Sequence, residues 1–142
     1  MAQKKRVLIL CTGNSARSQM AEGLLREFGE GKFTVESAGV APSSVRREAV
    51  EAMREIGVDI SRHRSKSIDE FRDCNFDFII TVCDNAKETC PVFPGSATRI
   101  HQNFTDPPPE TIGDYQSRLK VFREVRDEQR EWFSDFTCQQ KL

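Results

Sequence analysis

Two residues suited to thiol and oxyanion chemistry, a cysteine and an arginine, stand close together near the start of the chain. Cys11 follows the apolar run 6–10, and Arg17 comes six positions later. A short loop between a strand and a helix turns its backbone N–H groups inward, and the helix N-terminus adds partial positive charge. A guanidinium matches two oxygens of a tetrahedral oxyanion. We therefore expect an oxyanion-binding loop, made of Cys11, Thr12, Gly13, Asn14, Ser15, Ala16, Arg17 and Ser18.

The positive field of this loop is also expected to act on the Cys11 thiol. It should lower the pKa of Cys11 well below ~8.5 and make the residue a nucleophilic thiolate, with Ser18 as a further donor to the sulfur. Gly13 and Asn14 are the residues that tolerate positive φ in the turn. The alternative is a buried structural cysteine with Arg17 in solvent. The loop is not a nucleotide-binding P-loop, which ends in Gly-Lys-Ser or Gly-Lys-Thr.

Hydrophobic periodicity predicts the elements that hold this loop in place. Strands and helices alternate along the chain, which favours an α/β domain with a parallel sheet and helices on both faces, spanning residues 1–142. In such sheets, ligands bind at the carboxyl ends of the strands. The expected strands are 6–10, 33–38, 76–82 and 97–101, and the expected helices are 15–28, 45–56, 68–71 (capped by Ser67) and 114–133.

Composition excludes several classes of function. The net charge of -1 argues against a general polyanion binder, so no nucleic-acid partner is expected. No apolar run approaches the ~20 residues of a membrane span, and the apolar stretch after the basic N-terminus is too short for a signal peptide. We expect a cytoplasmic, monomeric protein. The five cysteines include no Cys-x-x-Cys pair, which weakens a structural zinc site.

The loop after the first strand resembles the signature of low-molecular-weight protein tyrosine phosphatases and of their relatives, the arsenate reductases. Its continuation, Ser18-Gln19-Met20-Ala21-Glu22-Gly23, is more similar to the reductases. The resemblance extends from Arg6 to about Phe133. It implies a four-stranded parallel sheet flanked by helices, of the low-molecular-weight tyrosine phosphatase type.

A late aspartate is the expected general acid. Both families carry an Asp-Pro pair whose aspartate protonates the leaving group, and the resemblance assigns this role to Asp106, before Pro107. An Asp-Pro pair is also common in plain turns. The phosphatases usually place tyrosines after the pair, whereas Pro108 and Pro109 follow here, which argues against a phosphotyrosine substrate.

Two further cysteines suggest redox chemistry. Cys83 ends the expected strand 76–82, so its sulfur can emerge at the same sheet edge as Cys11, and Cys90 follows seven residues later. Resemblance to the thioredoxin-coupled arsenate reductases implies a relay in which a Cys11–Cys83 disulfide passes to Cys83–Cys90 and thioredoxin then reduces it. The alternative is inert thiols, or zinc ligands together with Cys74 or His101. Cys74 is expected to be packed and Cys138 exposed.

Some arsenate reductases bind a potassium ion beside the nucleophile loop through an asparagine, a glutamate, a serine and an aspartate. Asn14, Glu22 and Ser37 match the first three positions, and Lys66 stands at the fourth. Our hypothesis is that the lysine ammonium takes the cation's place, pairs with Glu22, and leaves no potassium bound.

The sequence as a whole favours an arsenate reductase that has no cofactor or metal and a weak phosphatase side activity. The main alternative is a small tyrosine or acid phosphatase that uses Cys11, Arg17 and Asp106 alone. A third possibility is a redox-sensing or zinc-binding module without turnover. Glutaredoxin or mycothiol are alternative reductants to thioredoxin.

Overall fold

In the part of the chain that the structure describes, eight segments of regular structure run in the order β-α-β-α, a 3-10 helix, then β-β-α. The computed structural model describes residues 4–84, 93 and 95–140. Over these residues the elements are β1 (Lys5–Cys11), α1 (Arg17–Phe28), β2 (Phe33–Gly39), α2 (Arg47–Arg54), η1 (Ile68–Phe71), β3 (Phe78–Thr81), β4 (Thr98–His101) and α4 (Tyr115–Gln139).

The sheet confirms the predicted fold class. Its strands follow the order β2-β1-β3-β4 in the part of the chain that the structure describes, and every neighbouring pair is parallel. The central strand β1 is the apolar run seen in the sequence, and Val7–Leu10 is wholly inaccessible to solvent. A continuous apolar strand is typical of a parallel sheet covered on both faces. Cys11 ends this strand and lies opposite Gly39 of β2.

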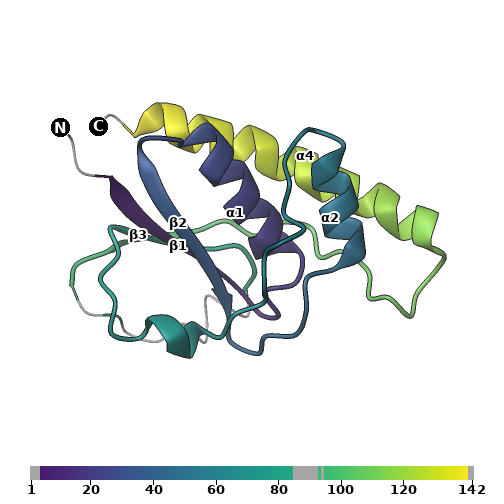
Figure 1. Ribbon diagram of the computed structural model, residues 1–142, viewed down its shortest axis with the longest axis horizontal. Coiled ribbons are helices and arrows are strands. Elements are labelled where there is room, and N and C mark those ends of the chain that lie inside the picture. Colours follow the sequence, from purple (N-terminus) through teal and green to yellow (C-terminus); the bar gives the residue numbers. More distant parts are fainter. Residues whose placement is uncertain (1–3, 85–92, 94, 141–142) are drawn as a thin grey trace.

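Helices α1, α2 and α4 pack against one another and cover the strands. Figure 1 shows the three grouped above the strands, with η1 on the opposite side. Helix α1 turns Met20, Leu24 and Leu25 into the core at the helical spacing that the sequence predicts. No helix in residues 4–84, 93 and 95–140 is both long and apolar enough to cross a membrane.

Several element boundaries differ from the prediction, most of all at α4, α2 and β3. Helix α2 covers only Arg47–Arg54 of the predicted 45–56. Helix α4 continues six residues past position 133 and ends at Gln139, because Phe136 keeps the apolar stripe going. The Phe136 ring stacks on the Phe33 ring, with their centroids 5.7 Å apart, and meets the Phe78 ring edge-on at 5.4 Å. These contacts with β2 and β3 fix the last turns of α4. Strand β3 covers only Phe78–Thr81 of the predicted 76–82. The Ser67 cap of η1 is confirmed, since its side chain accepts from the amide of Asp69.

Candidate active site

A cavity of about 280 Å³ opens at the carboxyl end of the central strand β1. Cys11 reaches it from the end of β1, and Asp106 reaches it from the loop beyond β4. Most of its lining belongs to the predicted oxyanion loop, and the rest comes from the residue just before α2 and from the segment after β4: Cys11, Thr12, Gly13, Ser15, Ala16, Arg17, Arg46, Asp106 and Pro107. A larger cavity of about 520 Å³ lies between the segment after β4 and helix α4, but its described lining contains no thiol.

Arg17 and Asp106 lie together, as their proposed roles require. Nη2 of Arg17 is 3.3 Å from Oδ1 of Asp106, and Nη1 donates to the carbonyl of Phe104 at 3.1 Å. The guanidinium is 12% exposed and the aspartate 79% exposed. Gln129 of α4 donates to the Arg17 carbonyl at 2.9 Å. The arginine is therefore held in a fixed direction, while the carboxyl stays accessible to solvent protons.

Asn14 gives the loop its shape. It has a φ of 48°, the conformation that the sequence suggested for Gly13 or Asn14, and Gly13 is not among the positive-φ residues. Asparagine reaches this region more readily than most residues because its short polar side chain bonds locally. The buried amide donates to the hydroxyls of Ser18 and Ser37 at 2.8 and 2.9 Å. Its Oδ1 accepts from Gln19 at 2.9 Å and from the Lys66 amide at 2.8 Å.

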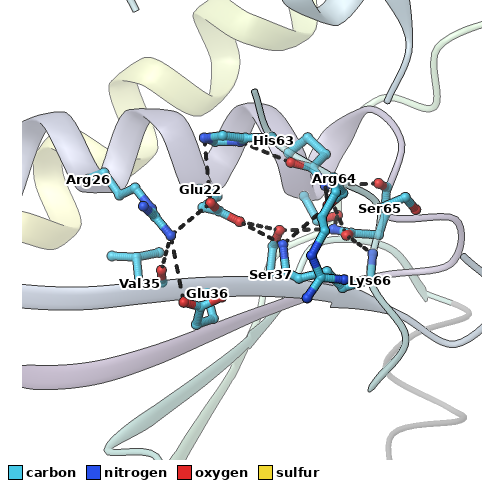
Figure 2. A network of polar contacts seen from close by, with 12 residues as sticks. Glu22, Arg26, Val35, Glu36, Ser37, His63, Arg64, Ser65 and Lys66 are labelled. Carbon is cyan, nitrogen blue, oxygen red and sulfur yellow. Dashed lines mark hydrogen bonds and ion pairs between the residues drawn. The ribbon is translucent and has the colours of Figure 1, made fainter. Parts of the chain in front are cut away.

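A buried carboxylate, Glu22, lies behind the loop and contacts two cations, a histidine and a serine (Figure 2). Oε2 is 3.0 Å from Nη2 of Arg26 and 3.6 Å from Nε2 of His63. Oε1 accepts from the Ser37 hydroxyl at 2.5 Å and lies 3.6 Å from Nζ of Lys66. Ser37 therefore links Glu22 to Asn14, and through this link the buried carboxylate supports the turn of the oxyanion loop.

The predicted pairing of Lys66 with Glu22 is confirmed. The Lys66 ammonium also donates to the carbonyl of Arg64 at 3.2 Å, so a carboxylate and a carbonyl hold a side chain that is only 8% exposed. The absence of a bound potassium ion stays a prediction. Burial lowers the pKa of His63, against the opposing effect of Glu22. The neutral imidazole contacts Gln19 through Nδ1 at 3.0 Å.

Cys83 packs directly against Cys11. Both thiols are reduced and buried, with exposures of 5% for Cys11 and 2% for Cys83, and the two side chains are in hydrogen-bonding contact. The Thr12 hydroxyl lies 3.4 Å from the Cys83 sulfur. The structure therefore brings Cys83 to the same sheet edge as Cys11, as the sequence predicts.

The expected direction of the Cys11 pKa shift is wrong for this arrangement. The Cys83 thiol and burial raise the pKa of Cys11, while Arg17 and the Thr12 amide lower it. The predicted pKa of Cys11 took account of the positive loop, but not of a second thiol packed against the first. Two buried thiols in contact titrate as a pair, and the field of Arg17 favours a single negative charge on that pair.

The remaining cysteines and His101 lie away from the reacting groups or outside the described residues. Cys90, and with it the proposed Cys83–Cys90 disulfide, is outside the described residues. Cys74 packs partly buried against the core, and Cys138 is exposed on the last turn of α4. The imidazole of His101 joins Thr81 to Asp84 through contacts of 2.7 Å on each ring nitrogen.

Sequence reasoning missed Arg46, which lies on the cavity wall just before α2. It forms part of no motif, and a backbone bond from its amide to the Ser15 carbonyl, at 2.9 Å, brings it to the oxyanion loop. That contact joins residues far apart in the chain, so no local pattern could have predicted it.

Comparison with known proteins places these features in a family context. Residues 6–137 match the family described as low molecular weight phosphotyrosine protein phosphatase. An arsenate reductase of Halalkalibacterium halodurans is 42% identical over 125 residues, covering 88% of this chain and 89% of the relative. An arsenate reductase of Bacillus subtilis is 39% identical over 126 residues, covering 89% and 90%.

The solved structures that resemble this chain include both arsenate reductases and a tyrosine phosphatase. An arsenate reductase in the phosphate binding state superposes with a TM-score of 0.75 at 31% identity, covering 95% of this chain and 98% of the other. A low molecular weight protein tyrosine phosphatase from T. tengcongensis reaches a TM-score of 0.80 at 26% identity, covering 96% and 100%. The backbone therefore resembles both activities, and the side chains have to distinguish them.

Proposed function

The chain belongs to the low molecular weight phosphotyrosine protein phosphatase family, and we propose that within this family it is an arsenate reductase with a three-cysteine relay. The relatives that are 42% and 39% identical to this chain are named arsenate reductases, and the similarity covers about nine tenths of each. We expect the reaction in the cytoplasm, where thiols are kept reduced.

The observation that carries this proposal is the second thiol, Cys83, in contact with the Cys11 thiol that lines the oxyanion cavity. Hydrolysis of a phosphate ester needs one nucleophile, an arginine and an acid, and Cys83 has no part in it. Reduction of an oxyanion needs two electrons, which two adjacent thiols supply when they form a disulfide. The described lining of the cavity also contains no aromatic residue to hold a phenyl ring, which favours a free inorganic oxyanion.

The first step follows from the positions of Cys11, Arg17 and Asp106. Arsenate binds to the amides of the loop and to Arg17, and the Cys11 thiolate forms an S–As bond. One oxygen leaves as water with a proton from Asp106, which is close enough to Arg17 to face the same oxyanion.

Reduction occurs in the second step. The Cys83 sulfur attacks the sulfur of Cys11, the S–As bond breaks, and its electron pair passes to arsenic, which leaves as As(III) in arsenite. Both sulfurs are then oxidised as a Cys11–Cys83 disulfide. Cys90 next attacks Cys83 and frees the Cys11 thiolate. A dithiol of thioredoxin supplies two electrons to the Cys83–Cys90 disulfide and closes the cycle.

The variant Cys83→Ser separates reduction from hydrolysis. It should lower arsenate turnover by about 10³-fold or more, because the S–As bond has no thiol to break it. Hydrolysis of p-nitrophenyl phosphate, the weak side activity, should persist, since Cys11, Arg17 and Asp106 remain. Cys74→Ser is the matched control and should leave both activities near those of the unaltered protein.

Turnover of arsenate by Cys83→Ser at an undiminished rate would contradict the relay. Loss of hydrolysis together with reduction would instead indicate that Cys83 holds the loop in shape. The reductant is identified by arsenate-dependent NADPH oxidation with thioredoxin and its reductase, compared with glutathione and glutaredoxin. We expect Cys90→Ser to release arsenite once per protein and then stop, because the second disulfide cannot form.

A further inference from the structure

Arg17 alone does not neutralise the negative charge that gathers when an oxyanion binds beside the Cys11 thiolate. Arsenate and phosphate are largely dianions near neutral pH, and a thiolate adds a third negative charge. Against these stand one guanidinium and the partial charge at the start of α1. Arg17 is moreover shared with the Asp106 carboxyl at 3.3 Å. A second fixed positive charge at the cavity would stabilise the bound dianion.

Arg46 lies where such a charge is needed. It lines the cavity together with Cys11, Arg17 and Asp106. Its side chain is 12% exposed, and its guanidinium lies over the Phe122 ring at 5.0 Å, which limits its motion. The buried Nε makes no hydrogen bond with any described residue, so this arginine keeps an unused donor.

A buried carboxylate fixes Arg46 without cancelling its charge. Oε2 of Glu48 accepts from Arg46 at 2.7 Å and from Arg118 at 2.8 Å. One carboxylate is thus shared by two guanidiniums, and this group of three carries a net positive charge. The group is held by α2 and α4 together, so the charge is pre-organised before any ligand arrives.

The only other carboxylate in contact with Arg46 among the described residues comes from residues 106–110, called the acid loop because it begins with Asp106. Oε1 of Glu110 lies 3.3 Å from the Arg46 Nε, without the alignment of a hydrogen bond, and Glu110 is 67% exposed. An exposed carboxylate is screened by water and held loosely. It reduces the field of Arg46 at the cavity but does not abolish it.

We propose that Arg46 is a second oxyanion-binding arginine of this site, which raises the affinity for doubly charged tetrahedral oxyanions, and that Glu110 opposes it. The inference deepens the proposed function by naming a residue that determines substrate affinity. The alternative role for Arg46 is to tether the acid loop through Glu110, with no effect on the ligand itself.

Titration with inorganic phosphate tests this without any turnover. Arg46→Gln should raise the dissociation constant for phosphate about tenfold or more, the usual loss for a charged hydrogen bond. Glu110→Gln should lower it about two- to threefold, because an opposing exposed charge is removed. The matched control is Arg47→Gln, which removes the same charge from an exposed neighbour that stacks on Tyr115 and does not line the cavity. It should leave the dissociation constant nearly unchanged.

The two roles predict different results for Glu110→Gln. If Arg46 only tethers the acid loop, both Arg46→Gln and Glu110→Gln should slow turnover and leave phosphate binding unaltered, which would overturn the proposal. An equal loss in Arg47→Gln would overturn it as well, because the effect would then be general surface charge. Arg46→Lys keeps the charge and should bind phosphate with intermediate affinity, which tests the proposal even if Arg46→Gln folds poorly.

Turnover gives an independent readout. Arg46→Gln should raise KM for arsenate while kcat changes little, since Cys11, Cys83 and Asp106 are untouched. If the chain failed to reduce arsenate at all, the phosphate titrations would still decide the role of Arg46. Failure of this inference and failure of the proposed function are therefore distinguishable.

Discussion

At the scale of single residues, the central feature is that Cys11 shares its site with Cys83. The arginine and the loop amides favour a thiolate, whereas burial and the neighbouring thiol disfavour it. The pair therefore holds at most one negative charge easily. In the reaction that we propose, this single thiolate charge is the one that attacks arsenic.

The variant Cys83→Ala should lower the pKa of Cys11. The Cys83 thiol is the largest influence raising that pKa, and without it the opposing effects of Arg17 and the Thr12 amide meet only burial. Alkylation of Cys11 by iodoacetamide, followed against pH by mass spectrometry, should shift to lower pH by more than about one unit. An unchanged or higher apparent pKa would mean that Cys83 donates to the thiolate instead. Cys138→Ala is the control.

At the scale of elements, two carboxylates fasten α2 to α4. Burial raises the pKa of Glu48, but hydrogen bonds from Arg46 and Arg118 outweigh it and lower the pKa to about 2. A hydrogen bond from Arg123, supported by one from Arg126, outweighs the opposing effect of burial and lowers the pKa of Glu55 to about 2. Since α2 begins beside the oxyanion loop, these contacts also fix one wall of the cavity.

The stability of the α2–α4 contact should therefore depend on pH in the acid range. A carboxyl whose pKa is depressed in the fold stabilises it above its unfolded pKa, and the gain is lost as pH falls toward 2. Urea unfolding should show Glu48→Gln less stable than the unaltered protein by about 3 kcal/mol at pH 7, with the difference shrinking between pH 5 and pH 2. Glu51→Gln, which removes a carboxylate paired within α2, should have a small effect at every pH. A constant difference for Glu48→Gln would point to packing instead of ionisation.

The elements that the sequence predicts well are those with local signals. The apolar run before Cys11, the period of α1 and the turn at Asn14 all depend on neighbouring residues, and the structure has them in place. The end of α4 was missed because it depends on Phe136 meeting Phe33 and Phe78, which are distant in sequence. Arg46 and the raised pKa of Cys11 were missed for the same reason, since each depends on packing between separate segments. The relay through Cys90 stays a prediction.

At the scale of the whole molecule, buried charges of opposite sign join segments that are distant in sequence. Figure 2 shows residues from α1, β2 and the segment 63–66 arranged around the Glu22 carboxylate. Lys66 and Glu22 are 8% and 2% exposed, and their charged atoms are 3.6 Å apart. Segments distant in sequence are thus joined beneath the oxyanion loop by groups that would be costly to bury alone.

Removing the ammonium should destabilise the molecule because it leaves Glu22 with one cation fewer in a buried position. Lys66→Met should lower the free energy of unfolding by about 3 kcal/mol, and the double variant Glu22→Gln with Lys66→Met should lose less than the two single variants combined. Chemical denaturation of the four proteins measures this coupling. Because the lysine supplies the positive charge, melting temperature and arsenate turnover of the unaltered protein should be equal in sodium and potassium salts of the same ionic strength. Additive losses, or turnover that rises steeply with potassium, would contradict this role for Lys66.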